Sequence, residues 1–443
     1  MACRKAPISR NDGEGWRNAT TLRLMFGTMF AAVALSLASA PSYAQQQVRI
    51  GDWIGTWTAS PQPVWGPDFP VPLNMPRNLR DQTLRQIVHV SIGGSRVRIV
   101  LSNEYGDQPM RIGAAHVALA GNGAAIAPGS DHGLTFGGQP TIVVPPGAPV
   151  VSDPVDLSVP AGGNLAVSLY LPDTTPLTTI HWEGVQTAYI SDSGNHAADP
   201  EIKATGTMKG RAFLTEVMVP AANGAHAVVV FGDSITDGAN STPDANRRWP
   251  DALAARLHKA GHDDVAVLDE AISGQRVLSN RMAVNALAAF GPEVLSQPHA
   301  RTVVLMMGIN DIGWPDSGLA PEDREPTAQE VIQGYKQLIA RAHMAGLRIL
   351  GATLTPFEDA FKGMAFPGYY TPEKEQIREE VNRFIRSGAF DGVIDFDKAV
   401  QDPANPKQIR ADFNSGDHLH PNDAGYAAMA DAVNLALIAQ PNH

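Results

Sequence analysis

The sequence predicts an α/β fold, with a three-layer α/β/α domain built on a parallel sheet and an all-β sandwich before it. Up to about residue 220, short alternating runs are separated by Gly and Pro, which is typical of antiparallel strands and turns. After residue 225, apolar runs alternate with helical patterns, which is typical of a parallel sheet covered by helices. The 443 residues are 44% hydrophobic and 18% charged, so intrinsic disorder as the main state is excluded.

Residues 1–44 are predicted to be a signal peptide. Basic residues precede an apolar run over residues 24–40, and Ser42-Tyr43-Ala44 fits a small-x-small cleavage site. Because about 17 apolar residues can just cross a bilayer, an uncleaved anchor is the alternative. We expect cleavage, export to the periplasm or the extracellular space, and no stable membrane insertion afterwards.

The charge balance and cysteine content exclude several classes of function. Cleavage would remove five of the 34 basic and two of the 45 acidic residues, which leaves a formal charge of −14. A chain this acidic is a poor candidate for binding nucleic acid, so we expect no nucleic-acid partner. The only cysteine, Cys3, lies in the predicted signal, so the mature chain has neither a thiol nucleophile nor an internal disulfide.

Residues 45–224 are predicted to form an accessory β-sandwich. Alternating or apolar runs at residues 86–92, 96–101, 141–144 and 166–171 are each followed by turn residues, and no long helical pattern is present. His181 and Trp182 lie between the predicted strands of this region. They could contact substrate, but a packed or exposed loop is the favoured interpretation.

Residues 225–443 are predicted to form the α/β domain. The segment 227–231 is a continuous apolar run, as expected of a strand covered on both faces. Further strands are predicted at 265–268, 302–306, 348–352 and 393–396, with helices at 249–259, 278–290, 328–345, 372–386 and 424–439. In such sheets the functional groups gather at the carboxyl ends of the strands.

The end of the first predicted strand carries a candidate nucleophile. Ser234 follows Gly232 and Asp233 at a strand-to-helix turn, where its hydroxyl and its N–H would face the sheet edge. The alternative is an ordinary turn in which Ser or Asp caps a helix.

Two further strand ends carry candidate oxyanion donors. Asn310 follows the strand at 302–306, and its amide can donate to an oxyanion. Gly274 follows the strand at 265–268 and can offer a backbone N–H. Taken singly, each segment also fits an ordinary loop or turn.

The segment Asp417-His418-Leu419-His420, before the last helix, carries a candidate base. Asp417 lies three residues before His420 and could hold its imidazole ring in one orientation. The alternatives are a helix cap or a zinc site, since two His and an Asp suit zinc. Because no further ligand cluster is present in the sequence, we expect no metal and no organic cofactor.

A long loop at residues 355–370 is rich in aromatic residues. It contains Phe357, Phe361, Phe366, Tyr369 and Tyr370. These side chains fit either the lining of a substrate cleft or a local packing cluster.

Together these segments resemble the SGNH hydrolases, also called GDSL esterases and lipases, whose four motif blocks centre on Ser, Gly, Asn and His. The resemblance covers about residues 225–440 and implies a flavodoxin-like α/β/α fold. It implies that Ser234 is the nucleophile, that Asp417 and His420 complete the triad, and that Ser234, Gly274 and Asn310 form the oxyanion hole. Thr236 stands where a Gly-x-Ser-x-Gly elbow would need its second Gly, so an ordinary α/β-hydrolase is disfavoured.

The β-rich region is similar to that of secreted two-domain SGNH members. The similarity lies in residues 53–61, 84–86 and 101–103. The resemblance implies a secreted serine esterase acting on small-molecule or polysaccharide esters, by way of an acyl-enzyme. The alternatives are a lysophospholipase or thioesterase with the same mechanism, and a non-catalytic carbohydrate-binding protein.

Overall fold

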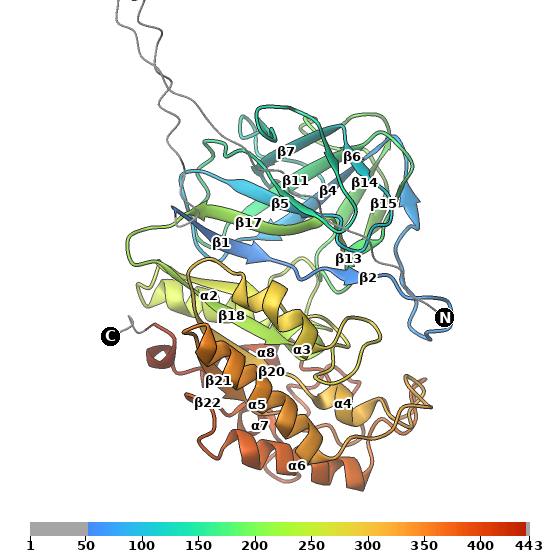
Figure 1. The fold of residues 1–443 in the computed structure, drawn as a ribbon, viewed down its shortest axis with the longest axis vertical. Coiled ribbons are helices and arrows are strands. Elements are labelled where there is room, and N and C mark those ends of the chain that lie inside the picture. Colours follow the sequence, from blue (N-terminus) through green and yellow to red (C-terminus); the bar gives the residue numbers. More distant parts are fainter. Residues whose placement is uncertain (1–51, 440–443) are drawn as a thin grey trace, which may run out of the picture. The chain divides into compact units, whose positions relative to one another are not determined.

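The computed structural model describes residues 52–439 (Figure 1). The predicted signal peptide at 1–44, including Cys3, lies outside the described residues. The last β-rich strand ends at Pro220 and the first strand of the parallel sheet begins at His226. The change of architecture thus falls where the sequence predicts it, while the division into separate domains stays a prediction.

The β-rich region contains two larger antiparallel sheets, and most of their buried apolar residues belong to one core cluster. The first sheet has the strand order β1 (Trp53–Thr58), β17 (Leu214–Pro220), β5 (Arg98–Ser102), β10 (Pro149–Val151). The second has the order β15 (Ala204–Met208), β14 (Ala188–Ser193), β4 (Gln82–His89), β11 (Asn164–Leu171), β7 (Ala114–Leu119), β8 (His132–Gly133). This confirms the predicted all-β sandwich.

Small sheets of two or three short strands complete the β-rich region. They are β12 (Thr175–Pro176) with β3 (Asn78–Leu79), β6 (Met110–Ile112) with β9 (Ile142–Val144), and β16 (Arg211–Ala212) with β13 (Thr179–His181) and β2 (Gln62–Pro63). Residues 84–86, in strand β4, bond to other segments of the β-rich region. Arg85 is fully buried and donates to the carbonyls of Ala124 and Asp199, and Gln86 exchanges two hydrogen bonds with the backbone of Ala212.

The second region is a five-stranded, wholly parallel sheet. Its order is β19 (Val265–Asp269), β18 (His226–Gly232), β20 (Ala300–Met306), β21 (Arg348–Ala352), β22 (Val393–Ile394). In chain order this is 2-1-3-4-5, the flavodoxin-like arrangement, whose switch point lies between the first and third strands. The carboxyl ends of β18 and β20 therefore border the crevice where such folds bind ligands.

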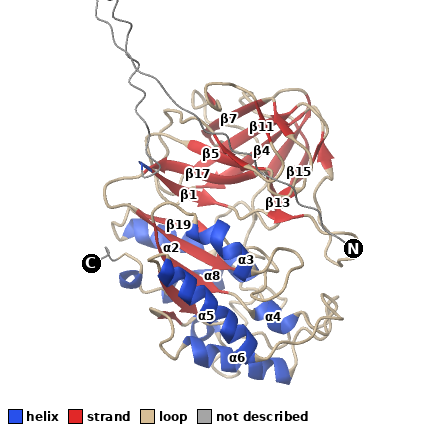
Figure 2. Ribbon diagram, viewed as in Figure 1, coloured by secondary structure: helices blue, strands red, loops and turns tan. Residues whose placement is uncertain are grey.

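Helices lie on both faces of this sheet (Figure 2). One contacting group is α2 (Trp249–Lys259), α7 (Phe396–Val400) and α8 (Asp423–Ala432). The other is α3 (Ala286–Ala289), α4 (Ile309–Gly313), α5 (Ala328–Met344) and α6 (Pro372–Ile385). The short helix α1 (Ser234–Asp237) follows β18 directly. The predicted three-layer α/β/α fold is confirmed.

Two predicted helices are shorter than the sequence pattern indicates. In place of a helix at 278–290, α3 is followed by a π-helix at Phe290–Leu295. Residues 278–285 do not form the predicted helix. The Asn285 N–H instead donates a hydrogen bond to the Asn280 side chain. The last helix ends at Ala432 rather than at 439, because Val433 adopts an extended conformation. A 3₁₀ turn follows at Leu435–Leu437.

Buried carboxyl groups lie where strand β1 of the β-rich region meets strand β19. The Ser60 hydroxyl donates to Glu270 at 2.5 Å, and the Gln297 amide donates to the other carboxylate oxygen at 2.7 Å. Burial, reinforced by neighbouring carboxylates, raises the pKa of Glu293 to about 8 and that of Glu270 well above its usual value. Both groups are therefore protonated in the folded protein under conditions where they ionise in the unfolded chain.

We expect the unfolding temperature to fall as pH rises from about 5 to about 8. Across this window the folded state binds protons that the unfolded state, with carboxyl pKa values near ~4.3, has released, so rising pH favours unfolding. Glu293→Gln should flatten this dependence, which thermal unfolding at a series of pH values measures. Glu330→Gln is the matched control, because bonds from Arg324 and Thr327 lower the pKa of exposed Glu330 to about 2. An unchanged slope in Glu293→Gln would contradict the assignment.

Candidate active site

The carboxyl end of β18 places Ser234 at the first residue of α1. The strand is buried along its whole length, and the chain turns at Asp233, whose carboxylate accepts from the Ile235 N–H at 3.1 Å and caps the helix. Gly232 is required at this turn, because a Cβ there would lie 2.3 Å from the Thr236 hydroxyl oxygen. Ser234 is 7% exposed and lines a cavity.

His420 and Asp417 reach Ser234 from the loop before α8. The Ser234 Oγ lies 2.8 Å from His420 Nε2, and His420 Nδ1 lies 2.6 Å from Asp417 Oδ2. Because Nδ1 faces a carboxylate, it carries the proton, and Nε2 is left free to accept from the serine hydroxyl. The neighbouring His418 instead lies with its Nδ1 2.9 Å from the Asn414 amide nitrogen.

The surroundings of Asp417 and His420 lower the pKa of the aspartate and raise that of the histidine. Burial alone would raise the pKa of Asp417, but the charge and hydrogen bonds of His420 and the N–H of Leu419 hold it well below its usual range. Burial alone would lower the pKa of His420, but the Asp417 carboxylate raises it above its ordinary value, with help from Glu183 and Asp233. The pair therefore has an ionised carboxylate beside an unusually basic imidazole.

Asn310 and Gly274 line the same cavity as Ser234. Asn310 is the second residue of α4, and the residue before that helix is Gly308, whose φ of 130° favours glycine. The Tyr369 hydroxyl donates to Asn310 Oδ1 at 2.9 Å and fixes the amide so that its nitrogen faces the loop of Gly274, where it donates to the Gln275 carbonyl at 3.1 Å. The structure thus brings together all five residues that the sequence predicts for the site.

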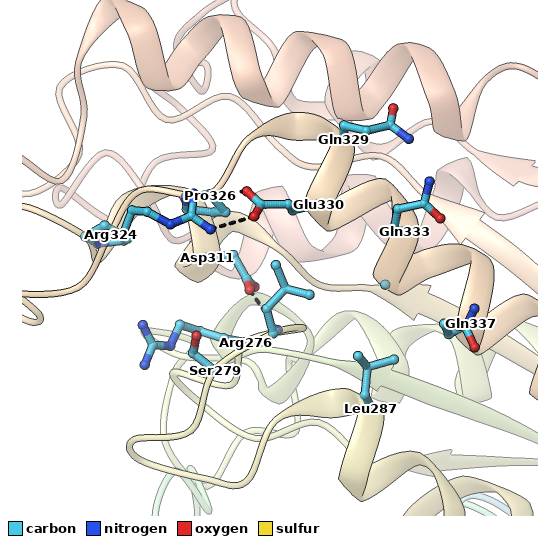
Figure 3. Close-up of a pocket in the computed structure, with 13 residues that line it drawn as sticks. Arg276, Ser279, Leu287, Asp311, Arg324, Pro326, Gln329, Glu330, Gln333 and Gln337 are labelled. Carbon is cyan, nitrogen blue, oxygen red and sulfur yellow. Dashed lines mark hydrogen bonds and ion pairs between the residues drawn. The ribbon is translucent and has the colours of Figure 1, made fainter.

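The loop that carries Gly274 is held on both sides by buried carboxylates. Asp311 accepts from the N–H groups of Val277 and Leu278 at 2.7 and 2.9 Å. Asp311 also lines a second cavity, which Figure 3 draws. Asp237, at the end of α1, accepts from the backbone N–H and the hydroxyl of Ser273, both at 2.9 Å. The loop is therefore tied to the helix of Asn310 and to the helix of Ser234.

The β-rich region contributes to the site, which the sequence analysis did not favour. His181 lies 3.0 Å from Asp237 through its Nε2 and 3.1 Å from the Ser60 carbonyl through its Nδ1. Trp182 and Glu183 line the cavity of Ser234. The interpretation of His181 and Trp182 as a packed or exposed loop was therefore incomplete, because His181 ends strand β13 and bonds to the nucleophile helix, and Trp182 lines the cavity.

The cavity at Ser234 has a volume of about 370 Å³ and a mostly apolar wall. Phe361, Phe366 and Tyr369 of the aromatic loop line it, and Phe361 also makes edge contacts with the other two rings. Phe357 is fully buried against Tyr369 and Tyr370. Both interpretations of the aromatic loop therefore apply, since it is a packing cluster with one side open to the cavity.

No group of three or more His, Cys, Asp or Glu side chains that could hold a metal ion is found among residues 52–439. Within the same residues, no helix is both long and apolar enough to cross a membrane.

The fold and the strand-end residues together define an α/β domain of hydrolase type. Residues 230–428 match the model of the GDSL-like lipase/acylhydrolase family. The match confirms the predicted SGNH/GDSL resemblance and the class of enzyme, an ester hydrolase. A comparison with curated proteins found no match.

Several solved structures are similar to about half of the chain. The acetyl xylan esterase AlAXEase is 20% identical, with 48% of this chain and 100% of that chain covered and a TM-score of 0.36. The carbohydrate acetylesterase Est24 from Sinorhizobium meliloti is 17% identical, with 48% and 99% covered and a TM-score of 0.36. A GDSL-like lipase from Bacteroides thetaiotaomicron is 15% identical, with 49% and 89% covered and a TM-score of 0.37.

Proposed function

We propose that the protein is an exported serine esterase that hydrolyses short-chain acyl esters, with O-acetyl groups of polysaccharides as natural substrates. The observation that carries this proposal is the hydrogen-bonded series from Ser234 through His420 to Asp417 at a cavity with a mostly apolar wall. The predicted signal peptide supports export.

In the first step, His420 Nε2 takes the proton of the Ser234 hydroxyl as the serine oxygen attacks the ester carbonyl. Asp417 stabilises the imidazolium that forms. The N–H groups of Ser234 and Gly274 and the amide of Asn310 stabilise the negative charge on the carbonyl oxygen. The intermediate then collapses, the alcohol leaves with the proton from His420, and the acyl group stays on Ser234.

In the second step, water takes the place of the alcohol. His420 removes a proton from the water, the resulting hydroxide attacks the acyl-enzyme, and the carboxylic acid leaves as the proton returns to Ser234. Neither step draws on a metal or an organic cofactor. Trp314, Met282 and Leu319 lie on the cavity wall and offer the acyl group an apolar surface to pack against.

Hydrolysis of p-nitrophenyl esters from acetate to palmitate tests the proposal. We expect the highest kcat/KM with acetate or butyrate, and no turnover above background in Ser234→Ala. Ser279→Ala is the matched control, because Ser279 is exposed and lines the separate cavity of Figure 3. Full activity in Ser234→Ala would overturn the mechanism, and a preference for long chains would favour the lysophospholipase or thioesterase alternative.

A further inference from the structure

A third cavity, distinct from that of Figure 3, adjoins the cavity at Ser234 and is larger. It has a volume of about 740 Å³ and lies between the β-rich region, the loop after α1 and the loop before α8. Glu183, Asn240 and Asp417 line both cavities. The two cavities therefore adjoin at these three residues.

The cavity at Ser234 and the adjoining cavity differ in the chemistry of their walls. Around Ser234 the wall is dominated by aromatic and aliphatic side chains, as described above. The adjoining cavity is lined mainly by amides, hydroxyls and charged groups: Glu183, Lys209, Asn240, Ser241, Asn414, Ser415, Asp417 and Asn422, with Val185, Pro243 and Met364 as its apolar side chains. A wall of this kind suits a ligand with many hydroxyl groups.

Two side chains in this cavity lack hydrogen-bond partners among the described residues. Ser241 is only 3% exposed, and its hydroxyl has no partner. The Glu183 carboxyl likewise forms no hydrogen bond or ion pair within residues 52–439. Because buried polar groups are almost always paired, the Ser241 hydroxyl marks a place where a ligand completes the bonding, and the half-buried Glu183 carboxyl is free to bind the same ligand.

The charges in the cavity favour a neutral ligand over an anion. The carboxylates of Glu183 and Asp417 oppose a phosphate or a carboxylate, and Lys209 is the only basic residue in the wall. Burial, together with the charge of Asp237, raises the pKa of Glu183 to about 7. Near neutral pH this group therefore both accepts hydrogen bonds and, when protonated, donates one, as hydroxyl groups of a sugar require.

We propose that this cavity is a subsite for the alcohol part of the ester and that it binds a saccharide unit through Glu183 and Ser241. The proposal rests on the proposed esterase function, because that function supplies the ester bond that joins the two parts of the ligand. It assigns to the β-rich region a part in choosing the substrate.

Binding to the inactive Ser234→Ala protein tests the subsite separately from catalysis. Calorimetry with acetylated xylotetraose should detect binding, and the added changes Ser241→Ala or Glu183→Leu should each weaken it by about tenfold, which is the effect of one lost hydrogen bond to a polar ligand. Neither side chain has a partner to lose within the described residues, so both variants should fold. Ser279→Ala in the same background is the matched control and should leave the affinity unchanged.

The other outcomes are distinguishable. If the wild-type protein hydrolyses p-nitrophenyl acetate but the affinity for the saccharide is the same in all variants, the subsite is wrong while the esterase function stands. If the saccharide binds as predicted but no ester is hydrolysed, the proposed function fails and the cavity remains a saccharide site. Tighter binding of acetylcholine than of the saccharide, lost in Glu183→Leu, would replace the saccharide by a cationic alcohol.

Discussion

Replacing His420 with alanine is expected to lower kcat for ester hydrolysis by about 10⁴- to 10⁶-fold. Without Nε2 at 2.8 Å, the Ser234 hydroxyl has no base and reacts only as an ordinary alcohol. Since serine and histidine act as a unit, the double variant Ser234→Ala/His420→Ala should be no less active than either single variant. Steady-state rates on p-nitrophenyl acetate measure both effects.

His418→Ala is the matched control for this experiment. It removes an imidazole from the same loop, but one that contacts Asn414 and not Ser234. We expect at most a severalfold loss, and thermal unfolding would verify that both variants fold. An equal loss of kcat in the two variants would contradict the assignment of His420 as the base.

Replacing Asp417 with asparagine is expected to lower kcat by about 10⁴-fold. The side chain keeps its shape, but an amide nitrogen facing Nδ1 favours the tautomer with the proton on Nε2, which cannot accept from Ser234. Asp412→Asn is the matched control, because Asp412 pairs with Arg410 on the protein surface. Similar losses in both variants would point to a general effect of charge rather than to the hydrogen bond with His420.

The same pair predicts the pH profile of the wild-type enzyme. His420 must be neutral to act as a base, and its raised pKa moves the acidic limb of kcat/KM above the ordinary histidine value of about 6.5. Activity is therefore lost as pH falls through the pKa of His420 and regained as pH rises. Asp417, with its lowered pKa, stays ionised throughout this range.

The strand ends and the residues after them could be predicted from the sequence because each signal is local. The apolar run at 227–231 followed by Gly and Ser marks both the buried strand β18 and the turn that exposes Ser234. Topology then brings Ser234, Gly274 and Asn310 to one edge of the sheet. Functional groups of parallel α/β sheets gather at the carboxyl ends of the strands, so the meeting of these residues could be expected from the sequence.

The remainder of the site depends on contacts between distant residues that no local pattern records. His181 and Asp237 are 56 residues apart, and nothing in the run around His181 indicates that it packs on the nucleophile helix. Glu183 likewise becomes part of the cleft only because the β-rich region packs against the loops at the sheet edge. The one available signal was the adjacent polar and aromatic residues His181 and Trp182 between predicted strands of the β-rich region.

The irregular segment at 278–285 shows a similar limit. Its apolar spacing fits a helix, but Asp311 captures the N–H groups of Val277 and Leu278, and Asn280 captures that of Asn285. Whether such N–H groups bond within a helix or to a side chain depends on the position of a carboxylate from a distant part of the chain. The same bonds hold the loop of Gly274, so the loss of helix is linked to the geometry of the site.

Labelling with a fluorophosphonate tests the central claim most directly, because this reagent forms a stable adduct with an activated serine. We expect intact mass spectrometry to show one adduct per chain, peptide mapping to place it on Ser234, and ester hydrolysis to fall in proportion to the fraction labelled. His420→Ala should react far more slowly, and Ser234→Ala should not react. Hydrolysis that continues after full labelling, or an adduct on a serine other than Ser234, would contradict the account.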